Sequence, residues 1–446
     1  MSPSFPGLLA VLALAEALIL VGRGLVRPLV RPEDGALYRA VLSLFAGSLA
    51  FHFLLAGLDA VGIPWHPALI AGGIVLLGIA ARRVVPRGAD EPARLPSDLG
   101  WGDGLAFAAW AGFTLFAVSL WITLPDFVYH WGSKGARFAV ERGIDYEYLS
   151  RSWNWVIHPD YPNFVPELYA GSALLAGRFD AAALMLWSGI WFGAVLACGR
   201  EALRRLGEDS KDGRFARQAG LAAVALGAAA FGIGHIQAGG ADWLITLALM
   251  AAVPVLLAPV SRQADLQIGL IAAFACASKV EGVTLAAFLI AAQLLRRLEW
   301  RGLVPRLLRL GLLSAAVALP WLAAVRHYHL FQEFNAGTFD PDKAAIIGPA
   351  LLTAFRMPAW HGLSFLLPLL LPCLWLDRRL RPVAAVVTLQ LAFYLYVYFT
   401  ARVGTDFLVT SSFPRLVLHL LPAVVVGVAG LGLGGVRARP SGRAGA

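Results

Sequence analysis

The chain has 446 residues, of which 59% are hydrophobic and 15% charged, and its mean hydropathy is +0.69. Soluble proteins carry about 25% charged residues, so this composition and the repeated apolar runs exclude a soluble globular protein and predict a polytopic α-helical membrane protein. The formal net charge is +9. The cysteines Cys198, Cys276 and Cys373 lie in separate apolar runs, which predicts core residues and neither a disulfide nor a metal site.

The apolar runs predict an all-α integral membrane protein with about thirteen transmembrane helices. The first run lacks a basic leader and a small-residue cleavage site, so we expect a retained span rather than a signal peptide. Residues 166–177 are expected to form a further, half-buried helix with Pro166 at its start. The predicted spans are 5–26, 37–57, 66–81, 104–123, 179–199, 219–236, 241–260, 265–278, 281–297, 307–325, 359–376, 382–400 and 414–435, and the short pair 265–278 and 281–297 also fits one broken re-entrant unit.

Arginine and lysine gather in alternate connections between these spans, whereas the connections 58–65 and 237–240 carry none. Short connections rich in Lys and Arg stay cytoplasmic. The pattern therefore predicts an N-terminus outside, one integral membrane domain over residues 1–436 and a cytoplasmic tail at 437–446. It also explains the positive net charge without nucleic-acid binding.

The segment 124–170 differs from the rest of the chain because it is long, polar, aromatic and rich in acids and histidines. Segments of this length are usually functional or disordered, and the aromatic content argues against disorder. Pro125 and Asp126 suit the start of a helix, and Gly143 suits its end. We expect this segment on the outer face, with its proposed site inside it.

On that helix Asp126, His130 and Lys134 are spaced to share one face, beside a row of aromatic residues. Such a helix is typical of the membrane interface, and the alternative is a surface helix with solvated charges. We expect Lys134 and Arg137 to contact solvent or lipid headgroups.

Other polar stretches fall on the same predicted outer face: HIQAGGAD at 235–242, ASKVEG at 277–282, and the loops 326–358 and 401–415. Ionisable residues at the ends of the adjoining spans are functional candidates by default, and they are Asp242, Lys279, Glu281 and Arg415. The simpler alternatives are a buried internal pair for Lys279 and Glu281, and a snorkelling interfacial anchor for Arg415.

An ordered series of motifs resembles the GT-C membrane glycosyltransferases, which include protein O-mannosyltransferases and the lipid A aminoarabinose transferase. The chain is similar to their bacterial relatives. Four predicted spans precede the acidic loop, whereas in well-known members that loop follows the first span. The motifs are LPDFVYHWGSKGARFAVERG, HPDYPNFVPELYA, GGADWLITLALM, SKVEG, PWL at 320–322 and TSSFPRLVLHLLP at 410–422.

The resemblance implies transfer of a sugar from a polyprenyl-phosphate donor to a glycan, lipid or protein acceptor, on the outer face of a bacterial inner membrane. A lipid phosphate is already a good leaving group, so the reaction needs a base and cations more than a strong acid. The resemblance gives the base role to Asp126, whose simpler alternative is a helix cap. Lys279 and Arg415 suit the phosphate oxygens, with Glu281 orienting Lys279.

Further substrate-binding candidates are His130, His158, Asp160, Tyr161 and Asp242. His158 and Asp160 suit acceptor, donor or, together with Asp126, a divalent metal, although the spacing matches no strong metal signature. A loop-packing role for His158 is equally open.

Trp153, Asn154 and Trp155 suit an interfacial belt better than sugar stacking. The rival function is a transporter or flippase for a lipid-linked or anionic solute, which would spread its charges along a path across the bilayer. We find no internal repeat of the kind on which many transporters are built. A third possibility is an inactive scaffold.

Overall fold

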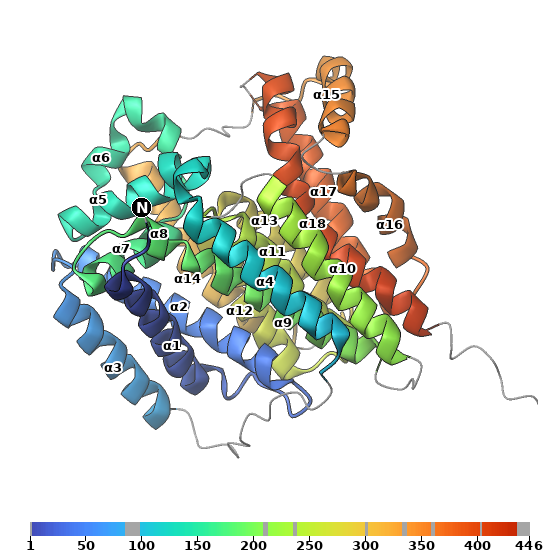
Figure 1. Cartoon of the computed structure of the whole chain (residues 1–446), viewed down its shortest axis with the longest axis horizontal. Helices are drawn as coiled ribbons and strands as arrows, with labels where there is room; N and C mark the ends of the chain where they lie inside the picture. The colour runs from blue at the N-terminus through green and yellow to red at the C-terminus, as the bar shows by residue number, and fades with distance from the viewer. Residues whose placement is uncertain are drawn as a thin grey trace, which may run out of the picture.

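The computed structural model describes residues 2–84, 99–207, 213–234, 239–298, 302–331, 337–357, 362–401 and 404–434. Within these ranges the secondary structure is entirely helical (Figure 1). The long helices run side by side, and three short helices lie toward one end of the molecule: α5 (Gly132–Glu141) and α6 (Tyr146–Ser150) at the upper left of Figure 1, and α15 (Ala344–Arg356) at the upper right. We call this the α5 end.

Each of the thirteen predicted spans overlaps a helix. These helices are α1 (Phe5–Val26), α2 (Ala36–Ala60), α3 (Pro67–Val84), α4 (Trp101–Ser119), α9 (Leu186–Leu206), α10 (Gly213–Gly234), α11 (Asp242–Leu257), α12 (Arg262–Ser278), α13 (Val280–Leu295), α14 (Leu303–His327), α16 (Leu366–Leu374), α17 (Arg381–Thr400) and α18 (Thr405–Gly434). In the described ranges, eight helical segments are long and apolar enough to cross a membrane. The chain is therefore a multi-pass membrane protein, and the count of thirteen spans stays a prediction.

Helix α11 is the centre of the fold. Every residue from Asp242 to Leu256 is buried, so this helix is covered on all sides, by α9, α12 and α18 among others. A helix that is apolar all round belongs in the interior. Because Asp242 is its first residue, the fold carries a carboxylate directly into the core at the start of α11.

The segment 124–170 folds into short helices that pack onto the bundle. They are η1 (Trp121–Thr123), η2 (Asp126–Trp131), α5 (Gly132–Glu141), α6 (Tyr146–Ser150), η3 (Ser152–Ile157) and α7 (Phe164–Ala176). The expectation of a half-buried helix starting at Pro166 is wrong in two respects: α7 begins at Phe164, and its first ten residues are all buried. Gly135 and Gly171 allow this packing. A Cβ on Gly135 would lie within 3 Å of Tyr169, and a Cβ on Gly171 would lie within 3 Å of Phe51.

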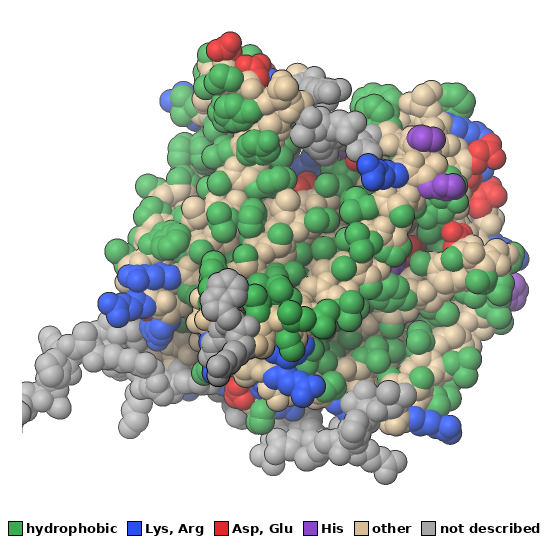
Figure 2. Space-filling model, turned by 180° about the vertical axis from the view of Figure 1, so that it is seen from behind, with side chains coloured by type: hydrophobic (Ala, Val, Ile, Leu, Met, Phe, Trp, Pro, Cys, Tyr) green, Lys and Arg blue, Asp and Glu red, His purple; other side chains and the backbone are tan. Residues whose placement is uncertain are grey.

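The end opposite the α5 end carries many of the arginines. Asp34 accepts hydrogen bonds from Arg31, Arg205 and Gln267, and Asp265 pairs with Arg306 and Arg309. Figure 2 shows many Lys and Arg side chains along the lower edge of one face, with the His side chains toward its upper right. The sequence predicts from this one-sided distribution of Lys and Arg that the arginine-rich end faces the cytoplasm. The predicted tail 437–446 lies outside the described residues.

The predicted topology can be tested at Ser150, an exposed residue of α6 at the α5 end. We expect a cysteine introduced at Ser150 to react with a membrane-impermeant thiol reagent in intact cells, because the one-sided arginines predict that this end faces outward. The three natural cysteines are the background to subtract, and Cys198 and Cys276 are buried. Labelling that requires permeabilised cells would reverse the topology.

Candidate functional site

The site begins at η2, a π-helical turn that opens with Asp126. The sequence predicts one regular helix ending at Gly143; instead the turn is π-helical, and α5 ends at Glu141, followed by the C-cap residue Arg142 in the left-handed conformation with φ 56°. Pro125 precedes the turn, as expected. Single π turns are rare and occur often at functional sites. The local backbone therefore marks the same residue that the sequence singles out.

Asp126 is bound to Arg415 rather than used as a helix cap. Nη1 of Arg415 lies 3.1 Å from Oδ2 and 3.4 Å from Oδ1 of Asp126. The two side chains are 12% and 24% exposed. Nε of Arg415 is buried and has no hydrogen-bond partner among the described residues. Arg415 is thus an inward-facing cation with an unused donor, so the interfacial-anchor alternative does not describe it.

A second ion pair is built around Asp242. Its Oδ1 accepts from Lys279 Nζ at 2.9 Å and lies 2.8 Å from His419 Nε2. His419 Nδ1 in turn lies 2.8 Å from the Tyr394 hydroxyl. A neutral His419 that donates from Nε2 and accepts from Tyr394 satisfies all of these contacts. The side chains of Asp242 and His419 are fully buried, so this network is rigidly held.

Lys279 is the single residue between α12 and α13. Its backbone is extended, with φ −160° and ψ 159°, so the two helices are separate elements joined at this residue. Its Nζ also lies 3.1 Å from Glu281 Oε1. The alternative of a buried internal pair with Glu281 is therefore present, and Asp242 joins it as a further carboxylate that the sequence had not placed there.

Gly240 lies between the two ion pairs. A Cβ built on Gly240 would be 3.2 Å from Asp126 Oδ2 and 3.5 Å from Asp242 Oδ2. The carboxylates from η2 and α11 therefore face the same small space. Asp242 Oδ2 is buried and has no hydrogen-bond partner among the residues that the structure describes. Two cations, Lys279 and Arg415, flank this space, and we call these five residues the charge site.

Aromatic and imidazole rings from the 124–170 segment cover the charge site. The His130 and His158 ring centroids are 4.2 Å apart, and those of His158 and Tyr161 are 4.7 Å apart. Lys279 Nζ lies 5.8 Å from the Tyr161 ring centre. Asp160 and Tyr161 are buried. Tyr161 thus joins this ring cluster to Lys279, and the predicted residues that meet in direct contact come from four distant parts of the chain.

Lys134 is buried rather than in contact with solvent or lipid headgroups, so the expectation from the sequence is wrong for this residue. Its Nζ donates to the His158 carbonyl oxygen at 3.0 Å and lies 4.8 Å from the Trp131 ring centre. A long side chain can reach such partners where the backbone of the loop folds over it. Arg137 remains partly exposed and pairs with Asp145 and Glu141.

The tryptophans of η3 fit the interfacial belt by their exposure, which is 69% for Trp153 and 53% for Trp155. Asn154 is buried and donates to the Tyr148 carbonyl oxygen. The predicted metal set is not assembled. In the described residues no group of three His, Cys, Asp or Glu side chains has an arrangement suited to a metal ion.

Two residues of the site were missed. His419 and Tyr394 were given no role, although His419 lies inside the quoted motif TSSFPRLVLHLLP. The available signal was a histidine in the middle of an apolar span, because ionisable groups at membrane depth are rare and functional by default. Tyr394 gave no such signal, since aromatic residues are common in spans.

Two buried residues of the 124–170 segment, Lys134 and His130, predict that the stability of the folded protein depends on pH. Burial lowers the pKa of Lys134 from 10.5 to about 7, against the opposing charge of Asp160. Burial, together with His158, lowers the pKa of His130 from 6.5 to about 4. Each group binds its proton less tightly in the folded state, so stability should rise with pH between about 4 and 6.5 through His130, and between about 7 and 10.5 through Lys134.

The measurement is the unfolding temperature of the purified protein in detergent across this pH range. His130→Gln should flatten the acidic rise and Lys134→Met the alkaline one. Arg137→Gln, a partly exposed residue of the same helix, is the control and should leave both rises in place. A Lys134→Met protein that keeps the full alkaline rise would contradict the assignment.

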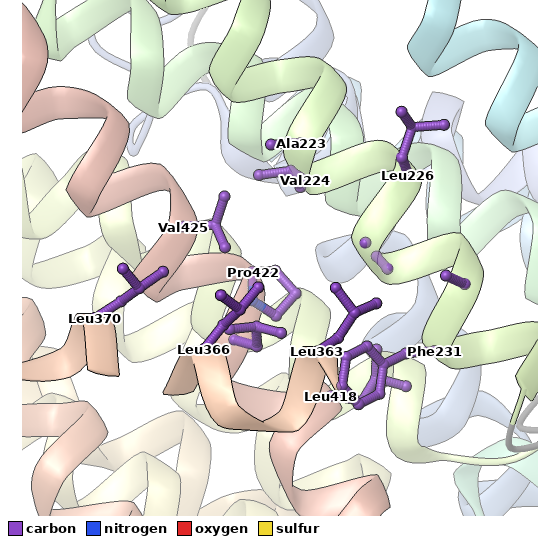
Figure 3. A pocket seen from close by; sticks show the side chains of 14 residues that line it. Ala223, Val224, Leu226, Phe231, Leu363, Leu366, Leu370, Leu418, Pro422 and Val425 are labelled. Atoms are coloured by element: carbon purple, nitrogen blue, oxygen red, sulfur yellow. The ribbon is translucent and has the colours of Figure 1, made fainter. Parts of the chain in front are cut away.

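An apolar groove runs along α18, the helix that also carries Arg415 of the charge site. Its volume is about 490 Å³, and α10, α18 and the segment 363–370 form its walls. Figure 3 shows Phe231, Leu363 and Leu418 close together at one end of the groove. Leu418 follows Arg415 by three residues on α18, a rise of about 4.5 Å along the helix. The groove therefore starts within one helical turn of the cation that holds Asp126.

Comparison of the chain with models of protein families, with curated proteins and with solved structures found no match.

Proposed function

We propose that the protein transfers a sugar from a polyprenyl-phosphate donor to an acceptor hydroxyl at the outer face of the membrane, as the resemblance to the GT-C enzymes implies. The observation that carries this proposal is a cluster of two cations and two carboxylates, of which one cation, Arg415, lies one helical turn from Leu418 in the wall of an apolar groove. A donor of this class joins a long apolar chain to an anionic phosphate, and the two surfaces suit its two parts.

The reaction assigns a part to each ion pair. Asp126 takes the proton of the acceptor hydroxyl while the hydroxyl oxygen forms a bond to the anomeric carbon of the sugar. The bond from that carbon to the phosphate oxygen breaks, and the polyprenyl phosphate leaves with the electron pair. Its negative charge increases, and Lys279 and Arg415 stabilise that increase. The transfer balances without an oxidant or a further co-reactant.

Arg415 links donor binding to the base. While it is paired with Asp126, the guanidinium of Arg415 occupies the carboxylate oxygens that would take the acceptor proton. A donor phosphate offers Arg415 a second anion, and its Nε is available for that contact. Movement of the guanidinium toward the phosphate weakens the pair and frees the Asp126 carboxylate to take the acceptor proton. Donor binding thus prepares the site for the acceptor.

The experiment is single-turnover sugar transfer from a synthetic polyprenyl-phosphate donor by purified Asp126→Asn protein. Asn keeps the size of the side chain and one oxygen for Arg415, so we expect a folded protein whose transfer is slower by about 100-fold or more, the usual contribution of a general base. Asp145→Asn, in the same loop but paired with Arg137, is the control. Normal turnover by Asp126→Asn in a folded protein would remove the base assignment.

The second candidate is a transporter for a lipid-linked or anionic solute. A specific observation favours it: the buried carboxylates Asp34 and Asp265 lie at the opposite end of the bundle, so ionisable groups are not confined to the α5 end. Each of these two carboxylates is paired with arginines, as in an ion pair that holds helices together. Flux of a polyprenyl-phosphate sugar across proteoliposomes, without transfer to any acceptor, would favour this candidate over the enzyme.

A further inference from the structure

A second cavity lies beside η2, and it shares no described lining residue with the apolar groove. Its volume is about 330 Å³. Three aromatic residues, Trp121, Phe127 and Phe179, contribute to its wall, and the Phe127 and Phe179 rings stack with centroids 6.4 Å apart. Arg178 and Asp180 are the charged residues that line it. None of these residues except Phe127 adjoins the charge site.

The cavity lies where three candidate membrane spans end. One span starts at Phe5, another ends at Ser119, and a third starts at Ala181, which lines the cavity. Beside it Phe5 and Ile122 are exposed by 77% and 69%, as side chains in contact with lipid would be. Span ends lie at the depth of lipid headgroups. The cavity is therefore placed to receive a molecule from the bilayer rather than from water alone.

Of the two charged residues at the cavity, Asp180 has several hydrogen-bond partners, whereas Arg178 makes only a loose contact. Asp180 accepts from the Ser4 backbone N–H at 2.7 Å, from the Ser4 hydroxyl, and from the Ala183 backbone N–H at 3.1 Å, so it holds the starts of α1 and of α8 (Ala181–Leu184). Arg178 lies 3.7 Å from Asp180, beyond hydrogen-bond distance, and its side chain is 61% exposed. Among the residues that the structure describes, the guanidinium of Arg178 is thus left largely uncommitted at the cavity.

We propose that this cavity binds the headgroup of an anionic membrane lipid. The guanidinium of Arg178 forms charge-assisted hydrogen bonds with the lipid phosphate, and the aromatic wall packs against the glycerol and the first part of the acyl chains. Zwitterionic lipids bind less well, because their own ammonium competes for the phosphate. This site takes a lipid whether or not the protein transfers a sugar.

The test is lipid retention by the purified protein in detergent, measured by native mass spectrometry with phosphatidylglycerol or phosphatidylcholine of the same chain length. We expect the wild type to retain phosphatidylglycerol at least about tenfold more strongly. Arg178→Gln removes the cation and Ala136→Phe fills the cavity from α5, and each should lower that retention about tenfold. Arg178→Lys keeps the charge and should lose less.

Arg151→Gln is the matched control, because Arg151 is a 41% exposed arginine at the same end that does not line the cavity. Equal losses in Arg151→Gln and Arg178→Gln would show general charge attraction and overturn the site. So would equal retention of the two lipids, or retention unchanged in both cavity variants. Sugar transfer is not part of this measurement, so failure here leaves the proposed function standing, and failure of transfer leaves this site standing.

Discussion

Gly240→Ala should slow sugar transfer by about tenfold or more while leaving the protein folded. The new methyl group would lie 3.2 Å from Asp126 Oδ2 and 3.5 Å from Asp242 Oδ2, in the space that both carboxylates face. It would fill part of this space, and the Asp126 carboxylate would have to move by a few tenths of an ångström, whereas 3.5 Å is an ordinary contact with Asp242. Misplacement by about 1 Å can cost about 100-fold in rate, so this smaller shift together with the lost space should lower the single-turnover rate by about tenfold or more.

Two features make this substitution informative. It changes no charge and removes no hydrogen-bonding side chain, so any loss reports on space within the site. Gly112→Ala on α4 is the matched control, since a Cβ there meets nothing within 4 Å. We expect wild-type turnover and equal or slightly higher stability for Gly112→Ala. Near-normal transfer by a folded Gly240→Ala protein would show that the reaction does not use this space.

Removal of either cation of the charge site should lower turnover at saturating acceptor by a comparable factor. In a partly dry site a cation beside the leaving phosphate is worth far more than in water, so Lys279→Ala and Arg415→Ala should slow the chemical step and weaken donor binding. Arg415→Lys should recover only part of the rate, because the planar fork of donors is lost. The readouts are single-turnover rate and donor affinity.

Lys279→Ala needs a companion variant because it also breaks a buried ion pair. Asp242 would be left with His419 alone, and removing one partner of a buried pair destabilises a protein by about 3–5 kcal/mol. In the double variant Lys279→Ala with Asp242→Asn, the uncompensated charge of the fully buried Asp242 is gone, and the charge that remains is that of Glu281, whose side chain is 17% exposed. We expect stability to recover while transfer stays low. Unchanged rate and donor affinity in Lys279→Ala and Arg415→Ala would return both cations to structural roles.

The predicted loop residues show where sequence reasoning stopped. Asp126 could be singled out because it is an acid beside a proline in an unusually polar segment. Its partner could not, because Arg415 lies 289 residues away and no local pattern joins them. Lys134 was misjudged for the same reason: its burial depends on how residues near His158 fold back over it, which the helical spacing of α5 does not encode.

The membrane class and the positions of the helices were determined by sequence alone, because the length of an apolar run and the exclusion of charge from hydrocarbon are local properties. Such properties also pointed to Lys279 and Asp242 as costly residues at span ends. Which charges pair was decided only by the tertiary structure. The packing of α11 in the core brings Asp242 to Lys279 and His419, and the π turn at η2 brings Asp126 to Arg415, since pairing energies depend on distances that span the whole chain.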